Sequence, residues 1–198
     1  MSSTFRDLCR DAGTVNELRD VVAKRGSAPL SPTEVAIIDR AAQRFQFPRK
    51  LRFAYAGSHS MDPLPDCFRA RAVGLGIRVT DFIAPYGQYM QQLLGNDTEL
   101  QAFRPDLLLV SCAIRQIAPR VQSEFESLSE PELNAEFDRI LAHVTEAAEL
   151  AASRLDATVL VGNFPRPRHP SLGVADTKRE LGETEFYLRL NLEMLRRF

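Results

Sequence analysis

Four short apolar runs, separated by stretches of helical periodicity, restrict the fold of this sequence more than any other feature. They are LRFAYAG at 51–57, IRVTDFIA at 77–84, DLLLVSC at 106–112 and ATVLVGNF at 157–164. Runs this short and apolar are typical of strands that are buried on both faces. Because helical stretches lie between them, we predict an α/β fold in which a parallel sheet carries helices on both faces.

The helical stretches are recognised by apolar residues at helical spacing and by capping residues. They predict helices at 14–25, 31–45, 63–75, 86–94, 130–155 and 183–198. The longest follows Ser129 and Glu132, which form a capping box. Two helices precede the first strand, so we expect a helical lead-in at 1–48 and the main α/β domain at 49–198. A proline-rich surface loop is expected at 165–177.

The last predicted helix reaches Phe198 with no cap, no glycine and no following strand. In an alternation of strands and helices, a helix after the fourth strand normally leads into a fifth. We therefore expect the native polypeptide to continue beyond residue 198.

Charge and composition exclude several classes of function. The chain has 25 basic and 26 acidic side chains and a net charge of −1, so no long-range field would attract nucleic acid or an anionic membrane. No apolar run approaches the ~20 residues that span a bilayer, and no secretion signal opens the chain, which predicts a cytoplasmic protein. The three cysteines are widely spaced and form no CxxC pair, so we predict neither a disulfide framework nor a metal site.

Candidate chemistry lies in the loops that follow the strands, because open parallel sheets bind ligands beyond the carboxyl ends of their strands. After the first strand, Gly57 permits a tight turn, and Ser58 or Ser60 places a hydroxyl there. A serine becomes a nucleophile when a histidine takes its proton. His59 adjoins Ser58 and His169 lies in the proline-rich loop, so either histidine is a candidate for this base. The alternative for His59 is a turn residue, and the alternative for His169 is a solvated loop histidine.

Other residues around the same edge are candidates for binding. Arg115, after the third strand, could bind a phosphate or carboxylate; the alternative is that it forms a surface ion pair. Gln88 and Tyr89 have hydrogen-bonding tips that would line the crevice, and Asn163 could donate to an oxyanion. Cys112, at the end of a buried strand, is a core residue or a nucleophile. His143 falls inside the long helix, where a structural or exposed role is expected.

Four segments together resemble the N-terminal region of FkbH-like proteins. These segments are GSHSMDPL at 57–64, APYGQYMQQLL at 84–94, AFRPDLLLVS at 102–111 and GNFPRP with LGVAD at 162–176. Their order and spacing agree with that family, and the similarity covers most of residues 1–198. The GQY and AF-x-PD pieces are its more specific parts.

The resemblance implies a flavodoxin-like, SGNH-hydrolase-like three-layer sandwich. In full-length members this domain is joined to a haloacid-dehalogenase-like (HAD-like) domain, and the protein loads a glyceryl unit onto an acyl carrier protein in polyketide-type biosynthesis. The DxDxT motif of that HAD-like domain is absent from this sequence. No cofactor is therefore expected in this chain. Mg²⁺ is expected only in an attached HAD-like domain. The expected partners are the carrier protein, the HAD-like domain and a second copy in a homodimer.

Two functional hypotheses follow. In the first, the chain is an SGNH-like domain that supports acyl loading by carrier docking or substrate positioning. In the second, it is an SGNH-type serine esterase or acyltransferase that uses Ser58, with His59 or His169 as base. Against the SGNH pattern, the turn lacks its aspartate and the final Asp-x-x-His block is missing.

Overall fold

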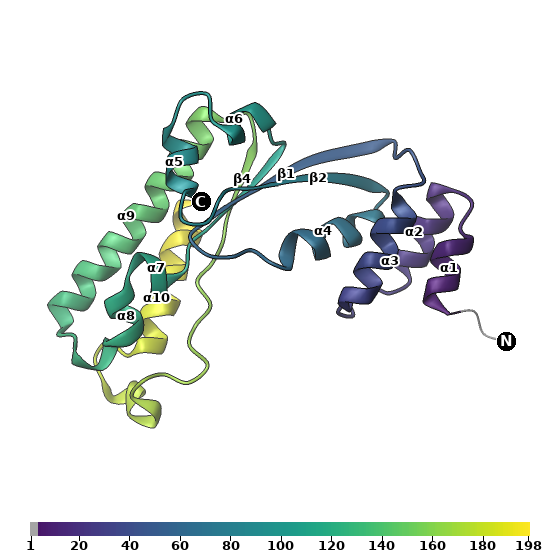
Figure 1. Ribbon diagram of the computed structural model, residues 1–198. Helices are drawn as coiled ribbons and strands as arrows, with labels where there is room; N and C mark the ends of the chain where they lie inside the picture. The colour runs from purple at the N-terminus through teal and green to yellow at the C-terminus, as the bar shows by residue number, and fades with distance from the viewer. Residues whose placement is uncertain (1–3) are drawn as a thin grey trace. The chain divides into compact units, whose positions relative to one another are not determined.

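The computed structural model describes residues 4–198 of the chain (Figure 1). Its helices are α1 (Phe5–Asp11), α2 (Val15–Ala23), α3 (Pro32–Ala42), α4 (Leu64–Val73), α5 (Tyr89–Leu94), α6 (Glu99–Phe103), α7 (Ile114–Ile117), α8 (Pro119–Ser123), α9 (Glu130–Arg154) and α10 (Glu183–Arg197). Its strands are β1 (Arg49–Gly57), β2 (Ile77–Ile83), β3 (Leu107–Ser111) and β4 (Thr158–Val161). Short 3₁₀ helices lie at Phe125–Ser127 and Gly173–Lys178.

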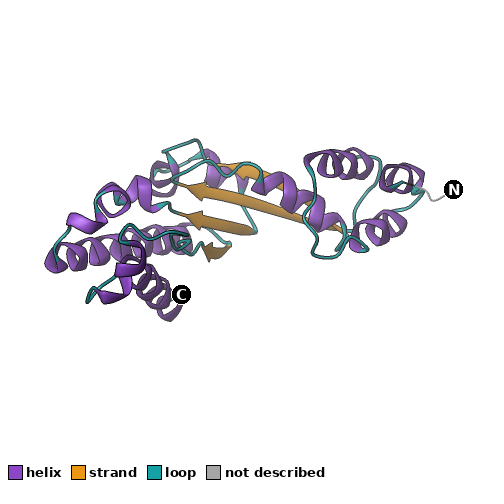
Figure 2. Ribbon diagram, turned by 90° about the horizontal axis from the view of Figure 1, so that it is seen from below, coloured by secondary structure: helices purple, strands orange, loops and turns teal. Residues whose placement is uncertain are grey.

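The four strands form one parallel sheet in the order β2-β1-β3-β4 (Figure 2). In the β3/β4 pair, Leu107 lies opposite Thr158 and Val110 lies opposite Val161. The predicted flavodoxin-like α/β sheet with preceding helices is confirmed. From β1 the chain passes to β2 on one side of the strand and later to β3 on the other. The carboxyl ends of β1 and β3 therefore border the topological switch point, where such sheets bind ligands.

The chain divides into two compact units, and a boundary between them falls within strand β1, between Phe53 and Ala54. One contains the residues up to Phe53 together with Met61–Phe82, and the other contains Ala54–Ser60 together with Ile83–Phe198. The first unit holds helices α1 to α4, whose core is built from buried aliphatic residues and Phe47. The second unit holds β3, β4 and the remaining helices.

A partly buried arginine connects three elements of the first unit. Arg69 of α4 donates to Asp81 of β2 at 2.6 Å and lies 3.4 Å from Asp39 of α3. Burial alone would lower the pKa of the Arg69 guanidinium, but these carboxylates raise it above its ordinary value. The arginine therefore stays charged and holds α3, α4 and β2 together.

In the second unit, α9 packs on β3 and β4 and also contacts α5 and α10. It begins with the predicted capping box, in which Ser129 and Glu132 exchange hydrogen bonds. The predicted apolar stripe of α9 is largely buried. Phe186 of α10 meets Phe125 and Phe137 edge to face, with ring centroids 5.7 and 5.6 Å apart. These aromatic contacts attach α10 to the core.

Several predicted boundaries are corrected. The helix expected at 86–94 begins at Tyr89, because Gly87 has φ 70° and breaks the helical backbone. The strand expected at 157–164 ends at Val161. The sequence reading also missed the short helices α1, α6, α7 and α8.

The loop expected at 165–177 is not wholly on the surface, because Asp176 is buried and caps α10. The Asp176 carboxylate accepts the N–H groups of Glu183 at 2.6 Å and Thr184 at 3.1 Å. The N-cap residue itself is Gly182, which has no side chain to cap with. A Cβ at Gly182 would collide with the Asp176 carbonyl oxygen, so glycine permits this close approach. Asp176, which precedes the N-cap residue Gly182 by six positions, thus replaces the usual N-cap side chain.

Candidate functional site

Ser58 lies at the switch point and links the ends of β1 and β3. Its N–H donates to the Ser111 carbonyl at 3.1 Å. Its Oγ accepts the N–H of Ala113 at 2.8 Å. Only 5% of Ser58 is exposed. The hydroxyl oxygen of Ser58 therefore accepts a hydrogen bond from the backbone of the loop after β3, and the hydroxyl hydrogen can still be donated to another group.

Close packing between the strand ends continues on the other side of β3. The Gly162 N–H donates to the Val110 carbonyl at 2.8 Å. A Cβ at Gly162 would lie 3.0 Å from Ser111 Oγ, which is tighter than an ordinary van der Waals contact. Gly162 therefore allows the end of β4 to approach β3.

Two buried polar atoms beside the switch point have no hydrogen-bond partner in the part of the chain that the structure describes. They are Nδ1 of the half-buried His59, after β1, and Oε1 of Gln116, in α7 after β3. The Gln116 amide nitrogen lies 3.5 Å from the Tyr86 hydroxyl, at the outer limit of a hydrogen bond. Buried polar groups normally find partners, so these atoms have capacity left for a ligand or for water.

A second polar cluster joins three elements near the end of β3. The Tyr89 hydroxyl of α5 contacts Nε2 of His143 in α9, and the Cys112 thiol lies 3.6 Å from the same hydroxyl. The Tyr89 and His143 rings are edge to face, with centroids 6.1 Å apart. The cluster was not predicted, because its members come from segments far apart in sequence. The one available signal was that His143 lies between Ile140 and Val144, which belong to the apolar stripe of α9.

Burial favours the neutral form of all three members of this cluster. It raises the pKa values of the Tyr89 hydroxyl and the Cys112 thiol. It lowers the pKa of His143, against the opposing effect of Glu146. The thiolate is the reactive form of cysteine, and burial disfavours it at Cys112. Cys112 is therefore a core residue that makes a weak polar contact with Tyr89. The cluster connects α5, α9 and β3 beside the switch point.

The remaining predicted site residues lie on the surface. Gln88, Arg115, Asn163 and His169 are exposed, and among the described residues no hydrogen bond or ion pair joins them to Ser58 or His59. Ser60 is exposed as well. The structure thus brings Ser58, His59 and Tyr89 to the carboxyl edge of the sheet and leaves His169 without a hydrogen bond to the serine.

Residues 4–198 contain no group of three or more His, Cys, Asp or Glu side chains that could hold a metal ion. No helix in this range is long and apolar enough to cross a membrane. Two cavities of about 590 Å³ each lie away from Ser58, one between α1 and α3 and the other beside α9, β4 and the end of α10.

Comparison with known proteins gives one structural likeness. No protein-family model and no curated protein matches the sequence. Among solved structures, the chain is similar to the N-terminal part of the protein BF1531 from Bacteroides fragilis, which contains a phosphatase domain and is complexed with Mg. The TM-score is 0.58 with 17% sequence identity, over 93% of this chain. The chain spans 42% of that structure's length, and the likeness shows a shared fold.

Proposed function

We propose that this chain is an SGNH-like α/β domain of the FkbH-like kind. In this proposal it supports the loading of a glyceryl or related acyl unit onto an acyl carrier protein, by docking or by positioning the substrate at the β1/β3 switch point. The resemblance at 57–64, 84–94, 102–111 and 162–176 suggests the family. The flavodoxin-like sheet and the likeness to BF1531, with its phosphatase domain, are compatible with it.

The observation that carries the positioning role is the hydrogen bond from the Ala113 N–H to Ser58 Oγ, 2.8 Å long. An activated serine nucleophile presents its oxygen to substrate and donates its hydrogen to a base. Here the oxygen is buried and accepts a backbone N–H, and no histidine is hydrogen-bonded to it among the described residues. Ser58 thus acts to set the geometry of the two loops.

The unpartnered atoms of His59, after β1, and of Gln116, after β3, suit a polyhydroxylated ligand. Gln116 Oε1 accepts a hydroxyl hydrogen, and His59 Nδ1 accepts or donates according to its tautomer. A glyceryl unit carries hydroxyl groups that would pair with both. In this proposal, Mg²⁺-dependent phosphoryl chemistry belongs to an attached HAD-like domain.

The second candidate is a serine esterase or acyltransferase, and one feature favours it. Ser58 has a neighbouring histidine whose Nδ1 is unpaired. If Ser58 Oγ rotated away from Ala113, its proton would go to His59 or His169, and the oxygen would attack the acyl carbon of an ester. The acyl–oxygen bond of the ester would then break, and the histidine would give the proton to the departing alcohol. The freed Ala113 N–H would then be available as an oxyanion donor.

A serine-reactive fluorophosphonate probe separates the two candidates. We expect no adduct at Ser58 in the folded chain, as read by mass spectrometry of its peptides. Specific labelling of Ser58 that is lost in Ser58→Ala and kept in Ser60→Ala would favour the enzyme.

A second experiment tests positioning directly. The chain is titrated with a glyceryl-loaded acyl carrier protein and followed by amide NMR. We expect shifts at His59, Ala113 and Gln116 that are weakened in the double variant His59→Ala/Gln116→Ala. The variant His169→Ala serves as the matched control, because this histidine is exposed and has no hydrogen bond to Ser58 or His59. A carrier that binds neither the wild type nor the control would contradict the proposal.

A further inference from the structure

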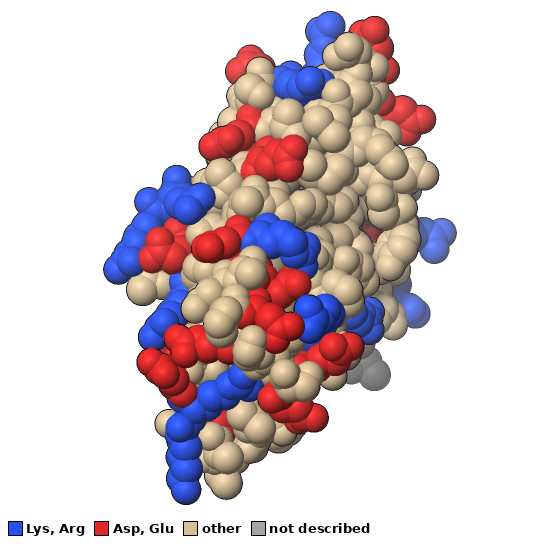
Figure 3. All heavy atoms as spheres, turned by 90° about the vertical axis from the view of Figure 1, so that its left-hand side faces the viewer, with Lys and Arg blue, Asp and Glu red and all other residues tan. Residues whose placement is uncertain are grey.

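The cavity between α1 and α3 is lined by four arginines and is called here the arginine groove. Arg6 and Arg10 come from α1, Arg40 comes from α3, and Arg44 follows the end of α3. The groove has a volume of about 590 Å³, and no carboxylate is among the described residues that line it. On the face of the molecule shown in Figure 3, by contrast, basic and acidic side chains are interspersed. The groove is therefore a local concentration of positive charge in a chain of nearly zero net charge.

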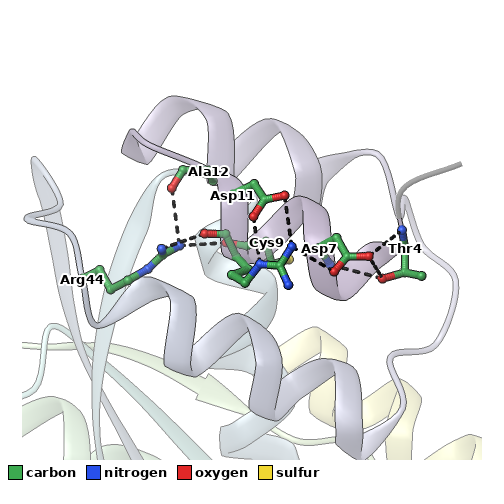
Figure 4. A network of polar contacts seen from close by, with 7 residues as sticks. Thr4, Asp7, Cys9, Asp11, Ala12 and Arg44 are labelled. Carbon is green, nitrogen blue, oxygen red and sulfur yellow. Dashed lines mark hydrogen bonds and ion pairs between the residues drawn. The ribbon is translucent and has the colours of Figure 1, made fainter. Parts of the chain in front are cut away.

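Two of the four arginines already have structural partners. Arg44 points its guanidinium at the end of α1 and donates to the carbonyls of Cys9 and Arg10, each at 2.8 Å (Figure 4). Arg10 forms ion pairs with Asp7 at 3.1 Å and with Asp11 at 2.8 Å. These contacts hold α1 against the segment after α3 and use much of the hydrogen-bonding capacity of both arginines.

Arg6 and Arg40 have no such partner among the described residues. Both are exposed, and neither forms an ion pair or hydrogen bond within residues 4–198. The carboxylates of α3 are engaged elsewhere, because Glu34 pairs with Arg25 at 2.6 Å and Asp39 pairs with Arg69. Arg6 on α1 and Arg40 on α3 therefore present their charges to whatever enters the groove.

The remaining lining of the groove is mainly apolar and small. Ala36, Ile37 and Ala41 of α3 lie between the arginines, with Thr33 one turn earlier. Small side chains let another backbone approach closely, and the methyl groups would bury apolar side chains of a partner. An apolar lining flanked by free cations from two helices is complementary to an amphipathic segment with an acidic edge.

We propose that the arginine groove docks an acidic amphipathic helix of a partner protein. Apolar side chains of that helix pack on Ala36, Ile37 and Ala41, and its carboxylates pair with Arg6 and Arg40. A free phosphate would leave the apolar lining uncovered. A membrane surface or a nucleic acid would bring phosphates against Asp7 and Asp11 beside the groove. The inference is independent of the proposed function, because its residues belong to the other compact unit.

The test uses the whole chain and a synthetic helical peptide of about 20 residues, with Leu on one face and Glu at its edges. A second peptide carries Lys in place of every Glu. Binding is measured by fluorescence anisotropy at two salt concentrations. The double variant Arg6→Glu/Arg40→Glu reverses the groove, and Arg166→Glu/Arg168→Glu applies the same charge change in the loop after β4. Within residues 4–198, none of these four arginines forms a hydrogen bond or an ion pair.

The expected result is that the wild type and the loop variant bind the Glu peptide, more weakly at high salt. The groove variant should bind it at least about tenfold less tightly and should gain affinity for the Lys peptide. Failure of the wild type to bind the Glu peptide would overturn the proposal. Equal weakening by both variants would also overturn it, because it would show attraction by net charge alone. Circular dichroism of each variant confirms that the fold is retained.

Discussion

Replacing Ser58 by alanine removes the hydroxyl that joins the turn after β1 to the loop after β3. The Ala113 N–H then loses its acceptor, while the second link, from the Ser58 N–H to the Ser111 carbonyl, is kept because it involves only backbone atoms. The perturbation is thus confined to one hydrogen bond at the switch point.

The magnitude follows from the burial of the two partners. Leaving a buried N–H without an acceptor costs about 1–3 kcal/mol. Ala113 is half-buried, so water can partly replace the lost acceptor, and Ser58→Ala should lie at about 1–2 kcal/mol. Since about 1.4 kcal/mol corresponds to a tenfold change in an equilibrium constant, exchange of the Ala113 amide hydrogen should accelerate by roughly 5- to 30-fold.

Hydrogen exchange followed by NMR reads this amide directly, and urea denaturation reports the loss in overall stability. Ser60→Ala is the matched control, because Ser60 is exposed and water can replace its hydroxyl. We expect little change in Ala113 exchange in that variant. Unchanged Ala113 exchange in Ser58→Ala would refute the structural role assigned to this serine.

Four further predictions concern stability and titration. Asp176→Ala should lower the stability of the second unit by about 2 kcal/mol through loss of the α10 cap, measured by thermal unfolding, with Asp176→Asn milder. Asn191→Leu should cost about 2–4 kcal/mol in urea denaturation, since it removes both hydrogen bonds to the Phe164 backbone. His143 should titrate below 6.5 by NMR, so its contribution to stability is present above pH 6.5 and decreases as the pH falls toward its folded pKa. Hydrogen bonds from Ser129 lower the pKa of Glu132 from 4.5 to about 2. The contribution of Glu132 to stability is therefore present above pH 4.5 and is lost as the pH falls to about 2. The variant Glu132→Gln should remove this pH dependence of unfolding.

Local chemistry explains which parts of the fold were predictable. The strands β1 to β4 were recognised because an apolar run marks a strand regardless of its neighbours. The starts of α3 and α9 were recognised because a capping box needs only residues three positions apart. The helices α7 and α8 were missed because such short segments carry too few residues to show a period.

The candidate site was predictable only in outline. Placing Ser58 at the carboxyl edge of the sheet followed from Gly57 and the preceding strand. That its oxygen accepts a backbone N–H could not follow, because the donor, Ala113, lies 55 residues away. The same distance in sequence concealed the contact of Tyr89 with His143, 54 residues apart.

The sequence by itself determined the α/β class, the four strands, the helical lead-in and the turn that bears Ser58, since each depends on neighbouring residues and on the period of the apolar pattern. The tertiary structure alone decided the strand order, the burial of Ser58 and Asp176, and the gathering of four arginines in one groove. These depend on which segments meet in space, and a single sequence does not record how distant backbone donors, carboxylates and apolar faces are paired.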